Sequence, residues 1–434
     1  MSTSLKSLFI SMEDDELFDT ELVVSPDDTV EQEIAETAEA YAESEQGSDD
    51  VTELGDISEG LESIVASMEA AMEDGGLSPQ AALFMQHAVN GYTRRLGLDA
   101  ASITPSMESF GGASGQAAAT TISMEGVGET LKKIWVAIKN AVSKAIQAVR
   151  NFFAKIFGGV AKLKQRSDGL KKAVNDLADE KGAKMKVPNA NTLRYKGKAD
   201  LGSILAGLKA TKAMGDGVYG TVVESAKSFY GQAVSKVLGR ADLDTTGSDA
   251  IKGELETMVK GTLEVYNKVI NVSNVISGDA VFKSSSTGDA EKGTGTGDSV
   301  PHLVKGYGFK SVDDGGTEVE APKKAELQSI LSAVDALLVQ MEGKKAALEG
   351  LSKAREEALK ATERKVEGWA SKLKEGGKQA LAGLIMRKVN MDVTRPVNQF
   401  YSHQFNVARA GLALVDRGVA SHKKGPAAAP KDKK

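Results

Sequence analysis

The sequence predicts an all-α protein, in which a multi-helix body with long helices follows a largely disordered acidic leader. Two observations support this fold class. After residue 125, apolar residues recur every three or four positions over long segments, as they do on one face of an α-helix. Residues 13–62 are instead rich in Asp, Glu, Ser and Thr, a composition that cannot bury enough apolar surface to fold alone.

The charges are segregated along the chain. Residues 1–125 contain 26 acidic residues and three basic ones, Lys6, Arg94 and Arg95, which gives a net charge of -23. The remaining residues contain 34 acidic and 51 basic residues, a net charge of +17. A body of that charge attracts polyanions such as nucleic acid or acidic membranes.

Within the leader, residues 1–125, two segments differ from the acidic background. Ser78 and Pro79 are an N-cap and a first helical residue, so we expect a helix to begin there. Residues 105–121 are small, rich in glycine and nearly uncharged, which predicts a linker that a protease could reach.

Residues 126–159 are predicted to form a basic amphipathic helix. Apolar residues from Leu131 to Ile156 follow helical spacing, and we expect Gly158 and Gly159 to end the helix. The basic residues of this helix are candidate contacts to phosphates or a partner: Lys132, Lys133, Lys139, Lys144, Arg150 and Lys155. Its apolar face either packs against other helices or a second copy, which we favour, or binds a membrane surface.

The rest of the body divides by composition. Residues 160–276 read as helical, with breaks at Pro188, at residues 215–217 and near residues 245–248. Residues 277–322 are predicted to be a flexible Gly/Ser/Thr-rich loop that can carry a small β-hairpin near residues 303–312. Residues 323–420 form the long-helix region, with a last helix over residues 396–419. Residues 421–434 are a basic tail expected to be disordered.

One tripeptide, Ser-Met-Glu, occurs four times, and every copy lies in the leader. The copies are Ser11-Met12-Glu13, Ser67-Met68-Glu69, Ser106-Met107-Glu108 and Ser123-Met124-Glu125. The wider pattern Ser-x-Glu is absent from residues 126–434. A small residue two positions before a glutamate is a pattern that a protease can recognise when it binds its substrate in extended form. Cutting after Glu125 would remove the acidic segment where the basic helix begins.

This arrangement resembles the internal head proteins of giant bacteriophages related to phiKZ, in which a prohead protease removes an acidic propeptide after small-x-Glu sites. The resemblance implies that Glu13, Glu69, Glu108 and Glu125 precede the cut bonds and that Gly126 becomes the new N-terminus. It also implies synthesis in the host bacterial cytoplasm and a final place inside the phage head. The implied partners are the prohead protease, the head scaffold or inner core proteins and the packaged double-stranded DNA. Self-association is a further option, because the apolar face of residues 126–159 can pack against a second copy.

The charge pattern suggests a role for the leader. A strongly basic body made among nucleic acids would bind them non-specifically, and an acidic leader can screen it until cleavage. The competing hypothesis is that the leader is only an address for the scaffold. An effector injected into the host cell would share the same maturation, and remains an alternative function.

We expect neither an enzyme nor a cofactor or metal site. The four histidines, His87, His302, His403 and His422, lack metal-ligand spacing, and catalytic motifs such as H-E-x-x-H or a P-loop are absent from the sequence. The adjacent Glu356 and Glu357 are interpreted as solvated helix surface rather than an acid/base pair. The chain contains no cysteine, which excludes disulfides and thiolate chemistry.

Overall fold

The structure is a computed structural model of the full chain. It describes residues 63–96, 104–111, 113–177, 184–187, 189–240, 248–270, 274–283, 301–305, 318–370 and 393–423, together with isolated residues between 50 and 61 and residues 385, 388 and 389. The Glu13 copy of the repeat and most of the acidic residues 13–62 therefore lie outside the described residues, as do the tail from residue 424 onward and most of the predicted central loop.

Helices dominate the described residues, which confirms the predicted all-α class. The α-helices are α3 (Pro79–Leu96), α4 (Ala113–Asn175), α5 (Ala190–Leu193), α6 (Leu201–Gly217), α7 (Val223–Gln232), α8 (Ser248–Val269), α9 (Lys324–Gly343), α10 (Lys345–Ala370) and α12 (Arg395–Lys423). Shorter helical segments are η3 (Met107–Phe110), η4 (Val218–Val222), η5 (Ala233–Leu238) and η6 (Ser277–Asp279). Residues 63–73 are also helical. The helix predicted to begin at Ser78 and Pro79 is confirmed as α3.

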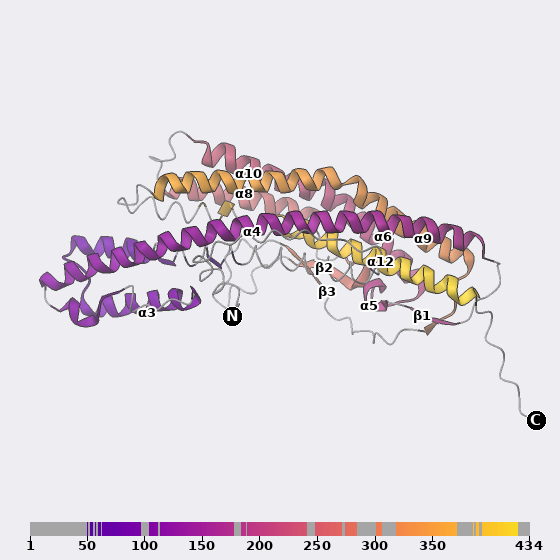
Figure 1. The fold of residues 1–434 in the computed structure, drawn as a ribbon, viewed down its shortest axis with the longest axis horizontal. Helices are drawn as coiled ribbons and strands as arrows, with labels where there is room; N and C mark the ends of the chain where they lie inside the picture. The colour runs from indigo at the N-terminus through magenta and orange to yellow at the C-terminus, as the bar shows by residue number, and fades with distance from the viewer. Residues whose placement is uncertain are drawn as a thin grey trace, which may run out of the picture.

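Helix α4 is the longest element and runs along most of the molecule (Figure 1). Its 63 residues correspond to a length of about 95 Å. Helices α9 and α10 lie antiparallel to its C-terminal part: Lys324 Nζ donates to Asn175 O at 2.7 Å, and farther along the pair Arg150 pairs with Glu356. Helix α12 packs against both α4 and α9. The apolar face predicted for residues 129–157 is thus packed against other helices, as we favoured.

The buried face of α4 repeats every 11 residues. Eleven residues rotate about the helix axis by three full turns plus only about 20°. Residues at this spacing therefore lie on the same face along a nearly straight helix. Two such series are buried throughout: Ala119, Thr130, Ala141, Phe152, Leu163 and Val174, and Val127, Ile138, Val149 and Val160. The first series crosses the Glu125–Gly126 bond without a change of register, so the helix has no packing boundary there.

Two predicted interruptions of α4 are wrong. The linker expected at residues 105–121 is helical from Ala113 onward, and the helix does not end at Gly158 and Gly159. Hydroxyl side chains near the start bond back to carbonyls four residues earlier, as Thr121 Oγ1 does to Ala117 O at 3.0 Å, so small polar residues fit the helix. Gly159 serves close packing: a Cβ there would lie 2.8 Å from the ring of Phe405 on α12.

The break predicted at residues 215–217 is also wrong, because α6 continues through η4, α7 and η5 as one helical run with two π-helical segments. The glycines again allow side chains of neighbouring helices to approach the backbone closely. A Cβ on Gly215 would collide with the side chain of Gln340 on α9, and one on Gly217 would lie 2.6 Å from Val269 on α8. Gln340 Nε2 donates to Asp216 Oδ1 at 2.6 Å, so this segment is a helix-packing site.

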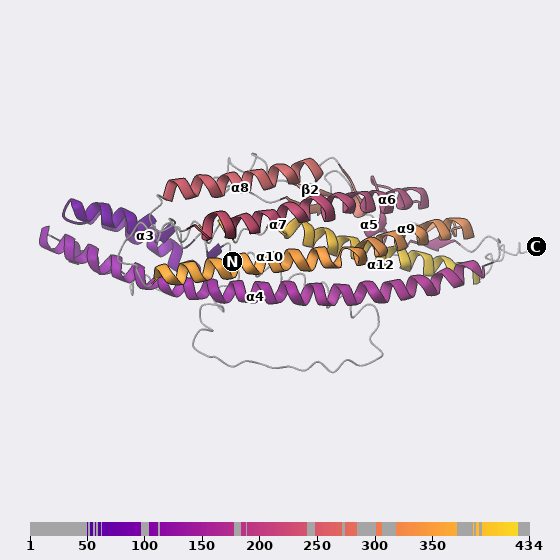
Figure 2. The ribbon, with the colours of Figure 1, turned by 90° about the horizontal axis from the view of Figure 1, so that it is seen from above.

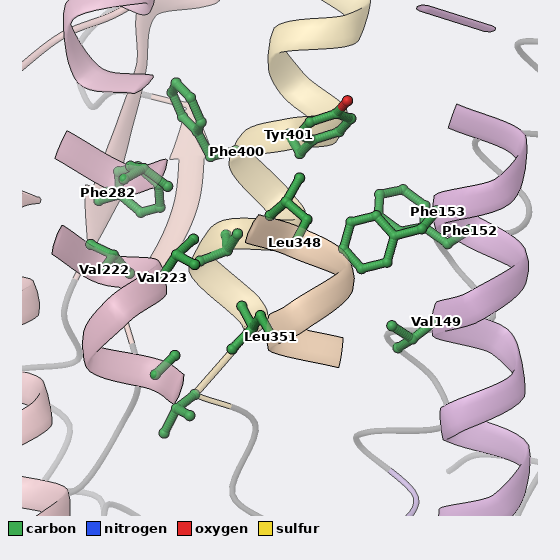
Figure 3. Close-up of a cluster of buried hydrophobic side chains, with 14 of the residues drawn as sticks. Val149, Phe152, Phe153, Val222, Val223, Phe282, Leu348, Leu351, Phe400 and Tyr401 are labelled. Carbon is green, nitrogen blue, oxygen red and sulfur yellow. The ribbon is translucent and has the colours of Figure 1, made fainter. Parts of the chain in front are cut away.

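One cluster of buried hydrophobic side chains lies where α4, α7, α10, α12 and β2 (Ala280–Lys283) meet (Figure 3). Figure 3 shows Phe152 and Phe153 of α4 facing Leu348 of α10 and Tyr401 of α12, with Phe282 and Phe400 on the other side. The rings of Phe153 and Tyr401 meet edge to face, with centroids 6.4 Å apart. The hydroxyl of Tyr401 donates to Met341 O at 3.3 Å, so this buried polar group has a hydrogen-bond partner.

Two short antiparallel ladders accompany the helices. Strand β2 pairs with β3 (His302–Lys305), and β1 (Met185–Lys186) pairs with β4 (Glu318–Val319). Strand β3 coincides with the start of the hairpin predicted near residues 303–312, but its partner β2 lies earlier, at the start of the predicted loop of residues 277–322. Residues 306–312 lie outside the described residues. The last helix, predicted for residues 396–419, extends from Arg395 to Lys423 as α12.

Candidate cleavage sites and basic helix face

The Ser106–Glu108 copy of the repeat lies in a short turn. Ser106 has an extended backbone, φ -64° and ψ 153°, and precedes the single 3-10 turn η3. Two backbone hydrogen bonds close this turn, Ser109 N to Ser106 O at 3.0 Å and Gly111 N to Glu108 O at 3.1 Å. Ser106, Glu108 and Ser109 are exposed. Gln86 Nε2, which donates to Pro105 O at 2.8 Å, and the buried Phe110 hold the two ends.

The Ser123–Glu125 copy lies in the interior of α4. Ser123 is fully buried, and its Oγ donates to Ala119 O at 2.9 Å. Glu125 is exposed and Gly126 is half-buried. Gly126 O also accepts from Thr130 Oγ1 at 3.0 Å. The predicted cut bond therefore belongs to a regular helix that is anchored on both sides.

The Ser67–Glu69 copy is also helical, within residues 63–73. Met68 is fully buried, whereas Glu69 is half-buried and Ser67 is exposed. Ser67 Oγ donates to Ser63 O at 2.9 Å, one turn earlier. Of the three described copies, only the one at residues 106–108 lies outside an α-helix.

The leader contacts α4 just before the Glu125–Gly126 bond. Leu77 N donates to Thr120 Oγ1 at 2.9 Å, and Gly76, with φ +103°, approaches the backbone of Gln116 so closely that a Cβ would lie 2.6 Å from its carbonyl carbon. A Cβ on Gly115 would likewise lie 2.9 Å from Ser109 O. Figures 1 and 2 show α3 beside this N-terminal end of α4. The body packs farther along the same helix, where Arg150 meets Glu356.

Three of the predicted basic contacts form a line on the outer side of α4. Lys133, Lys144 and Lys155 are exposed and spaced 11 residues apart, so they recur at about 16 Å along the helix with little rotation. The side chains of Lys132 and Lys139 lie outside the described part of the structure. We call Lys133, Lys144 and Lys155 the lysine line.

The remaining predicted contact, Arg150, has a structural role. It pairs with Glu356 on α10, and Lys360 also lies 2.6 Å from that carboxylate. The hydrogen bond from Lys360 and then that from Arg150 lower the pKa of Glu356, so its carboxylate stays ionised. Further ion pairs bind α4 to α9 and α12, including Arg166 with Asp416 at 3.2 Å and Lys171 with Asp335 at 3.0 Å. Bases on this side of α4 therefore face acids of the body.

Comparison with known protein families matches residues 32–417 to phiKZ-like phage internal head proteins. The chain belongs to this family. The match includes three of the four Ser-Met-Glu copies and the whole of α4. Similarity to curated proteins and to solved structures was not found.

Membership places this internal head protein in the interior of the phage virion, with a structural role, in a family that is not a known enzyme family. Among the described helices, none is both long and apolar enough to cross a membrane. Within the same described residues, His, Asp and Glu side chains do not gather into a group of three that could hold a metal ion.

One polar cluster of the internal head protein was missed by the sequence analysis. Arg194 and Asp279 form a buried ion pair with 2.6 Å between Nε and Oδ2, and their side chains are only 4% and 0% exposed. Gly197 N donates to Asp279 Oδ1 at 3.1 Å. Positive φ angles concentrate here, at Asn189, Lys196, Gly197, Gly278 and Asp279. No local pattern reveals this cluster because its two charged residues are far apart in the sequence.

His403 on α12 lies beside this cluster, in a cavity of about 300 Å³ that Asn191, Gly278 and Arg409 also line. Burial lowers the pKa of His403 to about 4, although a backbone hydrogen bond with Ser277 opposes the shift. The imidazole is therefore neutral at pH 7. Its Nε2 atom is buried and has no hydrogen-bond partner among the described residues.

Proposed function

We propose that this internal head protein is made as a precursor that a glutamate-directed prohead protease cuts after Glu13, Glu69, Glu108 and Glu125 during head maturation. Gly126 then becomes the N-terminus of the mature protein. The observation that carries this proposal is the restriction of Ser-Met-Glu to the leader, with the last copy at the change from net charge -23 to +17.

The contacts of the leader support Glu125–Gly126 as the final boundary. The leader contacts α4 at Gln116 and Thr120, and the body holds α4 by ion pairs from Arg150 onward. The proposed cut separates these two contact regions. It leaves on the mature chain the helical segment that packs against α9, α10 and α12.

The mature body, in this proposal, is packaged with the double-stranded DNA and binds its phosphates without sequence preference. Residues 126–175 contain 11 basic residues and two acidic ones, Glu129 and Asp168. The lysine line provides exposed cations on the outer side of this helix. Cations regularly spaced on a rigid helix contact phosphates by charge and do not read bases.

Salt-dependent DNA binding tests this function. The fragment of residues 126–434 should bind double-stranded DNA more tightly than the full chain, because the full chain retains the acidic leader. Replacing Lys133, Lys144 and Lys155 with Ala should weaken binding and reduce the slope of log K against log salt by about 2 to 3, if each lysine neutralises one phosphate.

A matched control uses three exposed lysines on α8, Lys252, Lys260 and Lys268. Helices α8 and α4 lie on opposite sides of the molecule in Figure 2. The triple Ala variant on α8 removes the same charge but should leave the salt slope nearly unchanged. Equal losses in the two triple variants would show that net charge alone drives binding, and no binding by residues 126–434 at low salt would refute a direct DNA contact.

A further inference from the structure

We propose that the precursor is cut in a fixed order: the Glu108–Ser109 bond is cut in the folded chain, and the Glu125–Gly126 bond only after local unwinding of α4. This order rests on the proposed proteolytic maturation. The two sites share the same tripeptide, so the difference between them arises from the fold and not from the recognition sequence.

The Glu108–Ser109 bond requires less rearrangement to enter an extended binding site than a bond inside a helix, although the fully buried Phe110 must move with it. The chain is already extended at Ser106 and again at Gly111, which has φ -76° and ψ 121°. Opening the turn between them breaks the two backbone hydrogen bonds made by Ser109 N and Gly111 N. The serine and glutamate of the repeat are exposed on this turn. An exposed turn with small polar residues is a preferred site of proteolysis.

The Glu125–Gly126 bond is protected by contrast. A protease that reads Ser123 must extract a fully buried residue whose hydroxyl is bonded to Ala119 O. Extending the chain around Gly126 also breaks helical hydrogen bonds on both sides of the bond and removes Val127 from its buried position. The bond is therefore cut from a minor, locally unwound population.

The first cut does not by itself release the leader. After cleavage at Glu108, the leader fragment still holds α4 through the Leu77 N to Thr120 Oγ1 bond and the close approach of Gly76 to Gln116. These contacts lie on the segment that only the second cut detaches from the body. Cleavage at Glu125 thus controls when the leader separates.

A time course on the full-length precursor tests the order, with cleavage products identified by mass spectrometry. One arm uses the prohead protease and the other a general glutamyl endopeptidase, which cuts after any accessible glutamate. The Glu108–Ser109 product should appear before the Glu125–Gly126 product in both arms. If only the prohead protease fails to cut, the proposed function fails while the accessibility order is still measured. If Glu125–Gly126 is cut first in either arm, the proposed order is overturned.

A pair of variants tests the unwinding step directly. Thr121 is exposed and lies outside the tripeptide, and Thr121→Ala and Thr121→Gly remove the same side-chain hydrogen bond to Ala117 O. Glycine weakens a helix interior relative to alanine, so the Gly variant should be cut at Glu125 about fivefold faster than the Ala variant. Cleavage at Glu108 should be the same in both. Equal rates at Glu125 would overturn the requirement for unwinding.

Discussion

The buried Arg194–Asp279 pair joins the chain after α5 to the segment that leads into β2. Removing one member of such a pair strands the other as an unpaired buried charge. Asp279 also accepts from Gly197 N, so its loss affects a turn in which several residues adopt positive φ. Sequence reasoning could not find the pair, because arginine and aspartate are common and only the fold brings these two together.

We predict that Asp279→Ala lowers the free energy of unfolding by about 3 to 5 kcal/mol, measured by chemical denaturation. The matched control is Asp168→Ala, which removes an exposed pair with Lys171 and should lower the free energy of unfolding far less than Asp279→Ala does. Similar losses in the two variants would contradict a special role for the buried pair.

His403 predicts a pH dependence of stability. Its folded pKa of about 4 lies below the ordinary value of 6.5, so the unfolded chain takes up a proton first as the pH falls. The stabilisation from keeping the imidazole neutral is complete above about pH 6.5 and is lost as the pH falls toward 4, by about 2 to 3 kcal/mol. Denaturation of the wild type and of His403→Gln at pH 7 and pH 4.5 should show a larger loss in the wild type. Equal losses of stability in the wild type and in His403→Gln would show that other groups cause the acid sensitivity.

At the scale of elements, helical periodicity predicted which faces are buried, but not where helices continue. In α9, apolar residues at helical spacing from Leu327 to Met341 are buried, and α12 begins within one residue of its predicted start. The helix breaks predicted at Gly159 and Gly215 are wrong, because the sequence does not distinguish a glycine that ends a helix from one that allows a neighbouring side chain to approach. The partners that distinguish them, Phe405 and Gln340, are distant in the chain.

Substitutions at the adjacent Gly158 and Gly159 test the role of glycine in close helix packing. A Cβ on Gly158 meets nothing within 4 Å, so Gly158→Ala should stabilise the protein by about 0.5 to 1 kcal/mol through helix propensity. A Cβ on Gly159 would lie 2.8 Å from the buried ring of Phe405, so Gly159→Ala should destabilise it by about 1 to 3 kcal/mol. Thermal or chemical unfolding measures both. Stabilisation by both substitutions would contradict the close packing of α4 and α12.

For the whole molecule, a single helix connects the leader and the body. The sequence predicted the division at residue 125 from charge and from the repeat, but it also predicted a flexible linker just before that point, where the structure has α4. Alanines and hydroxyl residues allow either state, and the contacts of the leader with Gln116 and Thr120 favour the helix here. The charge boundary is therefore a boundary of composition within one continuous helix, and it lies between the leader contacts at Gln116 and Thr120 and the ion pair of Arg150 with Glu356.

The central claim, proteolytic maturation at the Ser-Met-Glu sites, is tested most directly by the N-terminus of the protein in mature phage particles. Mass spectrometry of peptides with one non-specific end would identify it. The account predicts a chain that begins at Gly126, with leader peptides either absent or ending at Glu13, Glu69 or Glu108. An intact chain that begins at Met1 or Ser2 in mature particles would contradict it.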